Sequence, residues 1–261
     1  METLNKIVNK LEEEFNVKSF GKDQSFSRFI PFVYDPIGYK WEQTFEKDFT
    51  ELFNGLMIRG SANVSKVFLA VFPSSEVLER FINESSEGDL LFMHHPIAME
   101  CGDPKGKWGK GFIPIEEKYI DQIQKKKLSI YTCHIPMDCH TKLGPHIAMA
   151  QALNAEIIEL IEEYILICKI NEISTTEMVT KLKDLYEIPY VDFEGIMKNN
   201  INTIAIVAGC GDVVDWMKKA EHKGAQAYIT GEIHCHIDND YGRKRYDEMK
   251  LYAEETTMSL I

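Results

Sequence analysis

A strand–turn–helix–strand pattern occurs twice in this chain of 261 residues, and it constrains the fold more than any other feature. The first copy reads VSKVFLAVF, PSS, SEVLERFINES and DLLFM, and the second reads NTIAIVAG, CGD, DVVDWMKKAEHKG and AQAYIT. Apolar runs connected by helices of this length predict parallel strands in an α/β sheet. Setting Lys66 against Thr203 gives an offset of 137 residues that continues without a gap. Because the two copies share few identical residues, chance similarity is an alternative to the hypothesis of two related lobes.

The predicted architecture is therefore α/β with two related α/β lobes. We expect the first lobe to cover residues 1–125 and the second to cover residues 126–261. Within the first lobe, residues 1–20 begin with an amphipathic pattern that predicts a helix. Residues 21–50 combine many aromatic side chains with few periodic signals, so we expect a packed irregular loop or a lid there rather than a linker.

Charge and composition exclude several classes of protein. The formal net charge is −12, which argues against sequence-independent binding of nucleic acids because that needs many cations facing phosphates. The sequence has no apolar run of about 18 residues that would span a bilayer, and its start does not resemble a signal peptide. We therefore expect a cytoplasmic protein with no membrane partner. The six cysteines include no CxxC pair, so reduced thiols are expected, with Cys168 as a small core residue.

Three apolar strands are each followed by histidines or carboxylates. His94 and His95 follow the first, and His134 and Asp138 follow the second. The third, AQAYIT, precedes a polar run of Glu232, His234, His236, Asp238 and Asp240. Ligands of α/β sheets gather at the carboxyl ends of strands, and imidazole binds Zn, Fe, Mn, Ni or Cu. Together the three clusters predict a metal site.

Each cluster also has a simpler interpretation. Paired histidines are often structural, Asp138 could cap the helix that follows it, and the third cluster could be a solvated loop. A zinc site built from cysteines is a further alternative, because Cys133, Cys139 and Cys235 lie beside these histidines. Structural zinc sites usually take closely spaced cysteine pairs, which this sequence does not contain.

Three motifs carry a resemblance to a known family. HHP after one strand, H-x-x-x-D after the next, and GxxDVVDWMKKAxxxGAQAYITGE resemble the NIF-three-like family, whose members are also described as GTP cyclohydrolase I type 2 homologues. FNGLMIRG and VSKVFLAV match more weakly, and the resemblance runs from about residue 53 to the end. It implies a two-lobed α/β fold with a dinuclear metal site in the cleft between the lobes, to which the C-terminal part of the second lobe returns. It also implies a ring-shaped homohexamer.

The resemblance assigns roles by motif. It implies two divalent metal ions (Zn, Fe, Mn or Ni), with His94, His95 and Asp138 as ligands. His134 matches a histidine lining the site, and His236 matches a histidine that often follows the TGE turn. Either imidazole could carry protons, so both are our candidate catalytic residues. The TGE motif also implies that Thr230, Gly231 and Glu232 lie near the site. We add His234 as a candidate residue lining the site.

The sequence departs from the family pattern at three places. Residues 21–50 do not follow the usual opening, and Pro145-His146 stands where a smaller turn is usual. In the family a further strand precedes a Gly-His-x-x-(Ser/Thr)-Glu segment that completes the metal site. Here TTMSLI matches that strand and the sequence ends at Ile261. We expect either a truncated chain or a member without those two ligands, in which Glu232 or His236 substitutes.

The function that follows is a metal-dependent hydrolase acting on a small molecule such as a nucleotide, a phosphoester or a cyclic amide. The sequence contains no Walker-type phosphate loop. The alternative is a non-catalytic metal-binding adaptor or regulatory protein.

Overall fold

The chain divides into two compact units, and each is described by itself. The computed structural model describes residues 1–103 and 105–261. The first unit comprises Met1–Glu100 and Gly111–Met137, and the second comprises Cys101–Lys110 and Asp138–Ile261. The first unit therefore continues past the boundary that we placed after residue 125. The physical reason is that β8 (Ser129–Thr132) lies inside its sheet, between β2 and β5.

The first unit is built on a four-stranded sheet with strand order β2-β8-β5-β4. β5 is parallel to both β4 and β8, whereas β2 is antiparallel to β8. The other strands form two small antiparallel pairs, β1 with β3 and β6 with β7. The elements are β1 (Glu2–Thr3), α1 (Leu4–Glu14), α2 (Val17–Phe20), α3 (Phe26–Tyr34), the 3-10 helix η1 (Asp35–Ile37), α4 (Trp41–Thr44), α5 (Lys47–Leu52), β2 (Gly55–Ile58), β3 (Asn63–Val64), β4 (Val67–Ala70), α6 (Ser75–Glu84), β5 (Leu90–Met93), β6 (Ala98–Glu100), β7 (Gly111–Ile113), α7 (Glu117–Lys125), β8 and α8 (Ile135–Asp138), whose last residue belongs to the second unit.

Residues 21–50 are helical, which corrects our expectation of an irregular loop or lid. Phe26, Ile30, Val33 and Tyr34 recur at helical spacing, and all four are buried in one face of α3. Pro31 inside this helix hid the pattern at the sequence level, since proline usually ends or kinks a helix. These side chains join the main core of the first unit, together with apolar residues of β5, β8, α6 and α7. The expectation that the segment is packed is confirmed.

The second unit is built on a six-stranded sheet with strand order β11-β14-β13-β12-β10-β9. β12, β13 and β14 run parallel, and the remaining pairings are antiparallel. The TTMSLI segment supplies β14, so the strand that we expected there is confirmed. The elements are α9 (Pro145–Ala152), β9 (Glu156–Ile161), β10 (Ile165–Ile173), α10 (Thr175–Tyr186), β11 (Glu194–Gly195), β12 (Ile201–Cys210), α11 (Val214–His222), β13 (Ala227–Glu232), α12 (Asp240–Glu255) and β14 (Ser259–Leu260).

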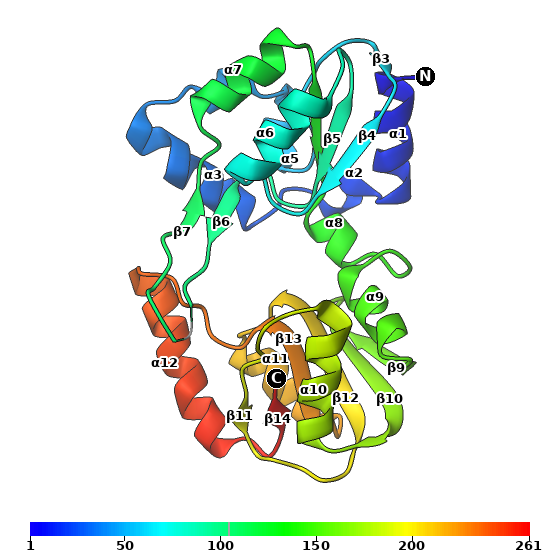
Figure 1. The fold of residues 1–261 in the computed structure, drawn as a ribbon, viewed down its shortest axis with the longest axis vertical. Coiled ribbons are helices and arrows are strands. Elements are labelled where there is room, and N and C mark those ends of the chain that lie inside the picture. The colour runs from blue at the N-terminus through cyan, green and yellow to red at the C-terminus, as the bar shows by residue number, and fades with distance from the viewer. Residues whose placement is uncertain (104) are drawn as a thin grey trace. The chain divides into compact units, whose positions relative to one another are not determined.

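Successive residues of the central strands enter two different cores, because side chains alternate across a strand. On β12, Ile204 and Ile206 pack with α9 and α10, whereas Ala205 and Val207 pack with α11 and α12. The second sheet is thus covered by helices on both faces (Figure 1). Cys168, on β10, is fully buried in the first of these cores, as expected.

The repeated pattern in the sequence is preserved in the register of the strands. In the first sheet Val67 pairs with Leu90, and in the second sheet Ile204 pairs with Ala227, so both positions move by 137 residues. The next three pairs along each strand keep the same offset. Helices α6 and α11 occupy the corresponding crossovers. The two units are therefore related α/β folds, which confirms the predicted fold class.

Among the described residues, no helix combines the length and the apolar character needed to cross a membrane.

Candidate metal centre

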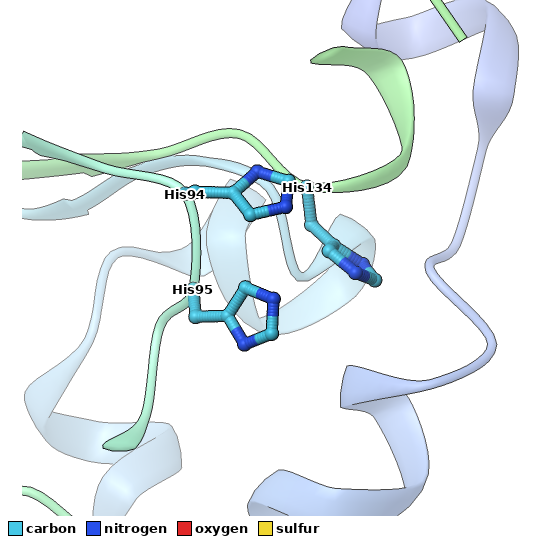
Figure 2. A group of neighbouring side chains, drawn as sticks. All are labelled: His94, His95 and His134. Atoms are coloured by element: carbon cyan, nitrogen blue, oxygen red, sulfur yellow. The ribbon is translucent and has the colours of Figure 1, made fainter. Parts of the chain in front are cut away.

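Three imidazoles from two neighbouring strand ends form a compact group in the first unit. His94 and His95 follow β5, and His134 follows β8. One ring nitrogen from each residue lies within 4.8 Å of the others, and the ring centroids are 4.8–5.1 Å apart. Figure 2 shows the three rings gathered around a common space. We refer to His94, His95 and His134 below as the histidine group.

The backbone explains how adjacent histidines reach one place. β5 ends at Met93, and the chain bends at His94 before Pro96, so the strict alternation of strand side chains does not apply. The amides of His94 and His95 still donate to the carbonyls of Ala70 and Val71, at 3.2 and 2.9 Å. These bonds continue the β4–β5 pairing and hold the bend in place.

Hydrogen bonds fix the tautomers of His94 and His134. The Nδ1 atom of His94 lies 2.9 Å from the Cys133 carbonyl oxygen, and that of His134 lies 2.7 Å from Oδ2 of Asp23. A carbonyl and an ionised carboxylate only accept, so both Nδ1 atoms carry the hydrogen. In a neutral imidazole the lone pair is then on Nε2. Metal-ligating histidines commonly donate their second nitrogen to a carbonyl or carboxylate in this way.

Asp23 is a functional candidate that the sequence analysis missed. The residue is 3% exposed, and its Oδ1 accepts from the amides of Ser25 and Phe26 at 2.9 and 3.0 Å. Burial alone raises the pKa of Asp23, but the hydrogen bond and charge of His134 and the two amides hold that pKa below its usual value. Asn54 joins the same network, because its Oδ1 accepts from the His134 amide at 2.7 Å. An aspartate just before a buried helical stripe was the available signal, since it is typical of a helix start.

Burial keeps His95 neutral. Its ring lies against Phe72 and Phe26, with centroids 4.5 and 5.1 Å away. Burial first, and then the neighbouring His134 and His94, lower the pKa of His95 well below its ordinary value. Its Nδ1 is buried and has no hydrogen-bond partner in the described part of the chain. A buried ring nitrogen without a partner fits a metal ligand.

Asp138 is not one of the residues of the histidine group. It ends α8 and belongs to the second unit, where its backbone carbonyl accepts from the ring of His146. Pro136 lies within the single turn of α8. A proline in the first turn of a helix loses no intrahelical bond, so the turn is compatible with it. The role of Asp138 as a metal ligand stays a prediction.

Three residues of the third predicted cluster, Glu232, His234 and His236, line a pocket within the second unit, whereas Asp238 and Asp240 are not among its lining residues. The pocket has a volume of about 500 Å³, within the usual range for a small-molecule site. Its apolar wall includes Tyr186 and Tyr190. Its polar lining includes the predicted residues Thr230, Gly231, Glu232, His234 and His236.

Two histidines of this pocket are held by polar partners. His234 Nε2 lies 3.0 Å from Oε1 of Glu194, and His236 Nδ1 donates to the His234 carbonyl over 3.0 Å. Burial lowers the pKa of His234, although Glu194 opposes the change. Glu194 also accepts from Lys250 at 3.0 Å and was not among our candidates. His236 packs against Trp108 and Tyr246.

The glycine of the TGE motif, Gly231, lies where two strands approach closely. Gly231 lies within β13, and a Cβ atom there would lie 2.8 Å from the carbonyl oxygen of Gly209. The neighbouring Thr230 donates its hydroxyl to the same carbonyl over 2.9 Å. The close approach of two backbones thus explains a residue without a side chain.

A fold of two related α/β units with a histidine group at the carboxyl ends of its strands defines a class of candidate metal-binding proteins. Residues 43–249 match the model of the DUF34/NIF3 (NGG1p interacting factor 3) family. The chain therefore belongs to the DUF34/NIF3 family.

Individual known proteins are similar to this chain in sequence or in fold. The GTP cyclohydrolase 1 type 2 homolog of Buchnera aphidicola subsp. Acyrthosiphon pisum (strain APS) is 27% identical over 201 residues, covering 72% of this chain and 74% of the relative. A solved structure described as protein ybgI of unknown function superimposes with a TM-score of 0.62 at 15% identity, covering 99% of this chain and 96% of that one. TTHA1606 from Thermus thermophilus gives a TM-score of 0.57 at 16% identity, covering 99% of this chain and 84% of that one. At these identities the structural likeness establishes the fold alone.

Proposed function

We propose that this chain is a metal-dependent hydrolase whose ligands include His94, His95 and His134. The orientation of these imidazoles carries the proposal. Two of them donate Nδ1–H to fixed acceptors, which places the lone pair on Nε2, and the third is kept neutral by burial. Three imidazoles whose ligand nitrogens lie within 4.8 Å of one another fit Zn, Fe, Mn or Ni.

When bound, a divalent cation supplies Lewis acidity, which activates water near neutral pH and polarises a substrate oxygen. The chain contributes orientation and exclusion of water. Asp23 holds the His134 ring in one tautomer, and Phe26 and Phe72 shield His95 from solvent. We further propose two ions with Asp138 as an additional ligand, which rests on the family resemblance.

The pocket of the second unit supports a small-molecule substrate, either a nucleotide, another phosphoester or a cyclic amide. The rings of Tyr186 and Tyr190 offer faces for a planar heterocycle, and Glu232 offers an acceptor for its N–H groups. We propose that His236 moves protons during hydrolysis. His134, which the sequence analysis also offered as a proton carrier, is proposed as a metal ligand instead, because its Nδ1–H is bound to Asp23 and its Nε2 would hold the metal.

Metal content per chain tests the site. Protein purified without an affinity tag or chelator is dialysed against Zn²⁺ or Mn²⁺, and bound metal is measured by plasma mass spectrometry. We expect His94→Ala and His134→Ala each to lose the metal of the histidine group. The matched control is His222→Ala, because His222 is an exposed histidine of α11. Metal content that is unchanged in both site variants would refute the ligand assignment.

Turnover tests the activity and separates it from the alternative function. Metal-loaded protein is offered GTP, simple phosphoesters and cyclic amides. The readouts are formate release from GTP, phosphate release from phosphoesters, and formation of the ring-opened product from cyclic amides. We expect turnover of at least one substrate that disappears in His94→Ala and persists in His222→Ala. A metal-loaded protein that turns over none of them would instead support the non-catalytic adaptor. The homohexamer and the cytoplasmic location belong to the same proposal and stay predictions.

A further inference from the structure

A second group of potential ligands lies in the second unit and contains no histidine. The sulfur atoms of Cys210 and Cys235 and a carboxylate oxygen of Asp212 all lie within 4.8 Å of one another. We call these three residues the thiol group. Neither Cys210 nor Cys235 forms a disulfide, so both sulfur atoms are available as ligands. This combination differs from the cysteine set weighed from the sequence, because it includes Cys210 and an aspartate.

The backbone of the thiol group is fixed by the sheet. Cys210 is the last residue of β12 and pairs with Glu232 at the end of β13. The next residue, Gly211, donates its amide to the Thr230 hydroxyl and accepts from the Tyr228 hydroxyl, both at 2.9 Å. These bonds set the turn that carries Cys210 and Asp212 before any ligand binds. Such preorganisation lowers the cost of binding.

Asp212 provides an independent sign of a missing ligand. The residue is 3% exposed. Its Oδ1 accepts from Arg245 at 2.6 Å and from the Cys210 thiol at 3.3 Å. Its Oδ2 is buried and has no hydrogen-bond partner among the residues that the structure describes. Buried carboxylate oxygens are normally satisfied, so an oxygen beside two thiols without a partner indicates an absent donor or cation.

The surroundings favour a cation over a neutral donor. Glu232 accepts from the Cys101 thiol at 2.7 Å and lies 3.6 Å from the sulfur of Cys210. Two carboxylates and three thiols therefore crowd one place, and the guanidinium of Arg245 is the cation bonded to Asp212. Arg245 occupies Oδ1 and leaves Oδ2 for another partner. A divalent cation would offset the charge of the two thiolates and give Oδ2 of Asp212 a partner.

We propose that the second unit binds one thiophilic divalent cation of the zinc class through Cys210, Cys235 and Asp212, with Glu232 in the fourth position. Zinc takes thiolate sulfur and carboxylate oxygen in four-coordinate sites, and thiolates select it over harder cations. On binding, the two S–H protons pass to solvent and two sulfur–metal bonds form, with no change in oxidation state. Cys101, hydrogen-bonded to Glu232, lines the pocket and connects this site to it.

Cobalt substitution tests the proposal, since thiolate ligands give intense near-ultraviolet charge-transfer absorption and imidazole ligands do not. Full-length protein is reduced with a phosphine, freed of the phosphine and titrated with Co²⁺ without oxygen. We expect a charge-transfer band that grows to one equivalent and vanishes when Zn²⁺ displaces the cobalt. Cys210→Ser and Cys235→Ser should each lose most of it. Cys168→Ser, which changes a buried cysteine of the same unit, should keep it.

A second measurement needs no variant. Zn²⁺ should slow alkylation of Cys210 and Cys235 in the wild-type protein at least tenfold, as mapped by peptide mass spectrometry, and leave that of Cys168 unchanged. Absence of the charge-transfer band in reduced wild-type protein would overturn the proposal. So would a band that persists in both serine variants, or alkylation that Zn²⁺ does not slow. Because the histidine group contains no sulfur, failure of the proposed hydrolase site would leave these readouts intact.

Discussion

The hydrogen bond between Asp23 and His134 gives the sharpest test of the histidine group. In Asp23→Asn the side chain keeps its shape, and the amide oxygen can still accept from Ser25 and Phe26, which bond to Oδ1. The amide nitrogen then replaces Oδ2, which in the wild-type protein accepts from the Nδ1–H of His134 over 2.7 Å. Two donors in contact repel, so His134 is expected to move its hydrogen to Nε2, the atom that we assign to the metal.

The magnitude follows from the geometry. Loss of the partner that orients a metal-ligating histidine typically costs a factor of about 10–100 in metal affinity, or about 1.4–2.8 kcal/mol. Asn54 adds to this cost, because its Nδ2 now lies 3.5 Å from Oδ2 of Asp23 and would also face a donor. The buried charge-assisted hydrogen bond is lost as well, which should cost about 1.5–3 kcal/mol of stability in the metal-free protein.

The assay is competition for Zn²⁺ between the protein and a chromophoric chelator, with folding checked by circular dichroism. The matched control is Asp35→Asn in the same aromatic segment, where the carboxylate accepts from Trp41 Nε1 at 2.9 Å and an amide oxygen can do the same. We expect the control to bind Zn²⁺ like the wild type. A folded Asp23→Asn protein with unchanged affinity would refute the inference that His134 binds metal through Nε2. Measuring both proteins with Cys210→Ser in the background removes any signal from the thiol group.

Three further predictions concern stability. The pKa of His95 is depressed in the folded state, so below about pH 6.5 only the unfolded chain takes up this proton. The urea midpoint of the metal-free protein should therefore decrease as the pH is lowered from about 7.5 to 5.5, and His95→Gln should make that decrease smaller. Ser174→Ala removes a capping box with Glu177 and should cost about 1 kcal/mol, whereas an unchanged urea midpoint would show that this cap contributes little. Gly231→Ala places a Cβ 2.8 Å from the Gly209 carbonyl oxygen and should lower stability by about 1–3 kcal/mol, and thermal unfolding that matches the wild type would show that β12 and β13 can separate at little cost.

Local patterns in the sequence determined much of the fold. The two apolar–helical–apolar runs predicted two related α/β units. The pairs Val67–Leu90 and Ile204–Ala227, which only the structure shows, keep the offset of 137 residues found in the sequence. The prediction of these elements was achievable because hydrophobic periodicity, which distinguishes strands from helices, can be read from neighbouring residues. The helices of residues 21–50 were missed because Pro31 interrupts a periodic apolar stripe that the core nevertheless buries.

The sequence also identified most of the candidate ligands, because imidazoles after apolar strands are visible without a structure. His94, His95 and His134 were all among the predicted site residues, and the structure brings them together. Their chemistry was decided only by tertiary contacts. Asp23 lies 111 positions before His134, and no local pattern connects the two residues.

The thiol group, like the histidine group, consists of residues that are visible in the sequence but meet only in the folded chain. Its members stand at the end of one strand, in the turn after it and beyond the end of another, and in the sequence they are separate cysteines and an aspartate without metal-ligand spacing. Residue types and short-range periodicity therefore determined which groups this protein possesses and which elements carry them. Only the folded chain decided which groups meet, which tautomer each imidazole adopts and which oxygen is left without a partner, because distances and burial depend on residues far apart in the sequence.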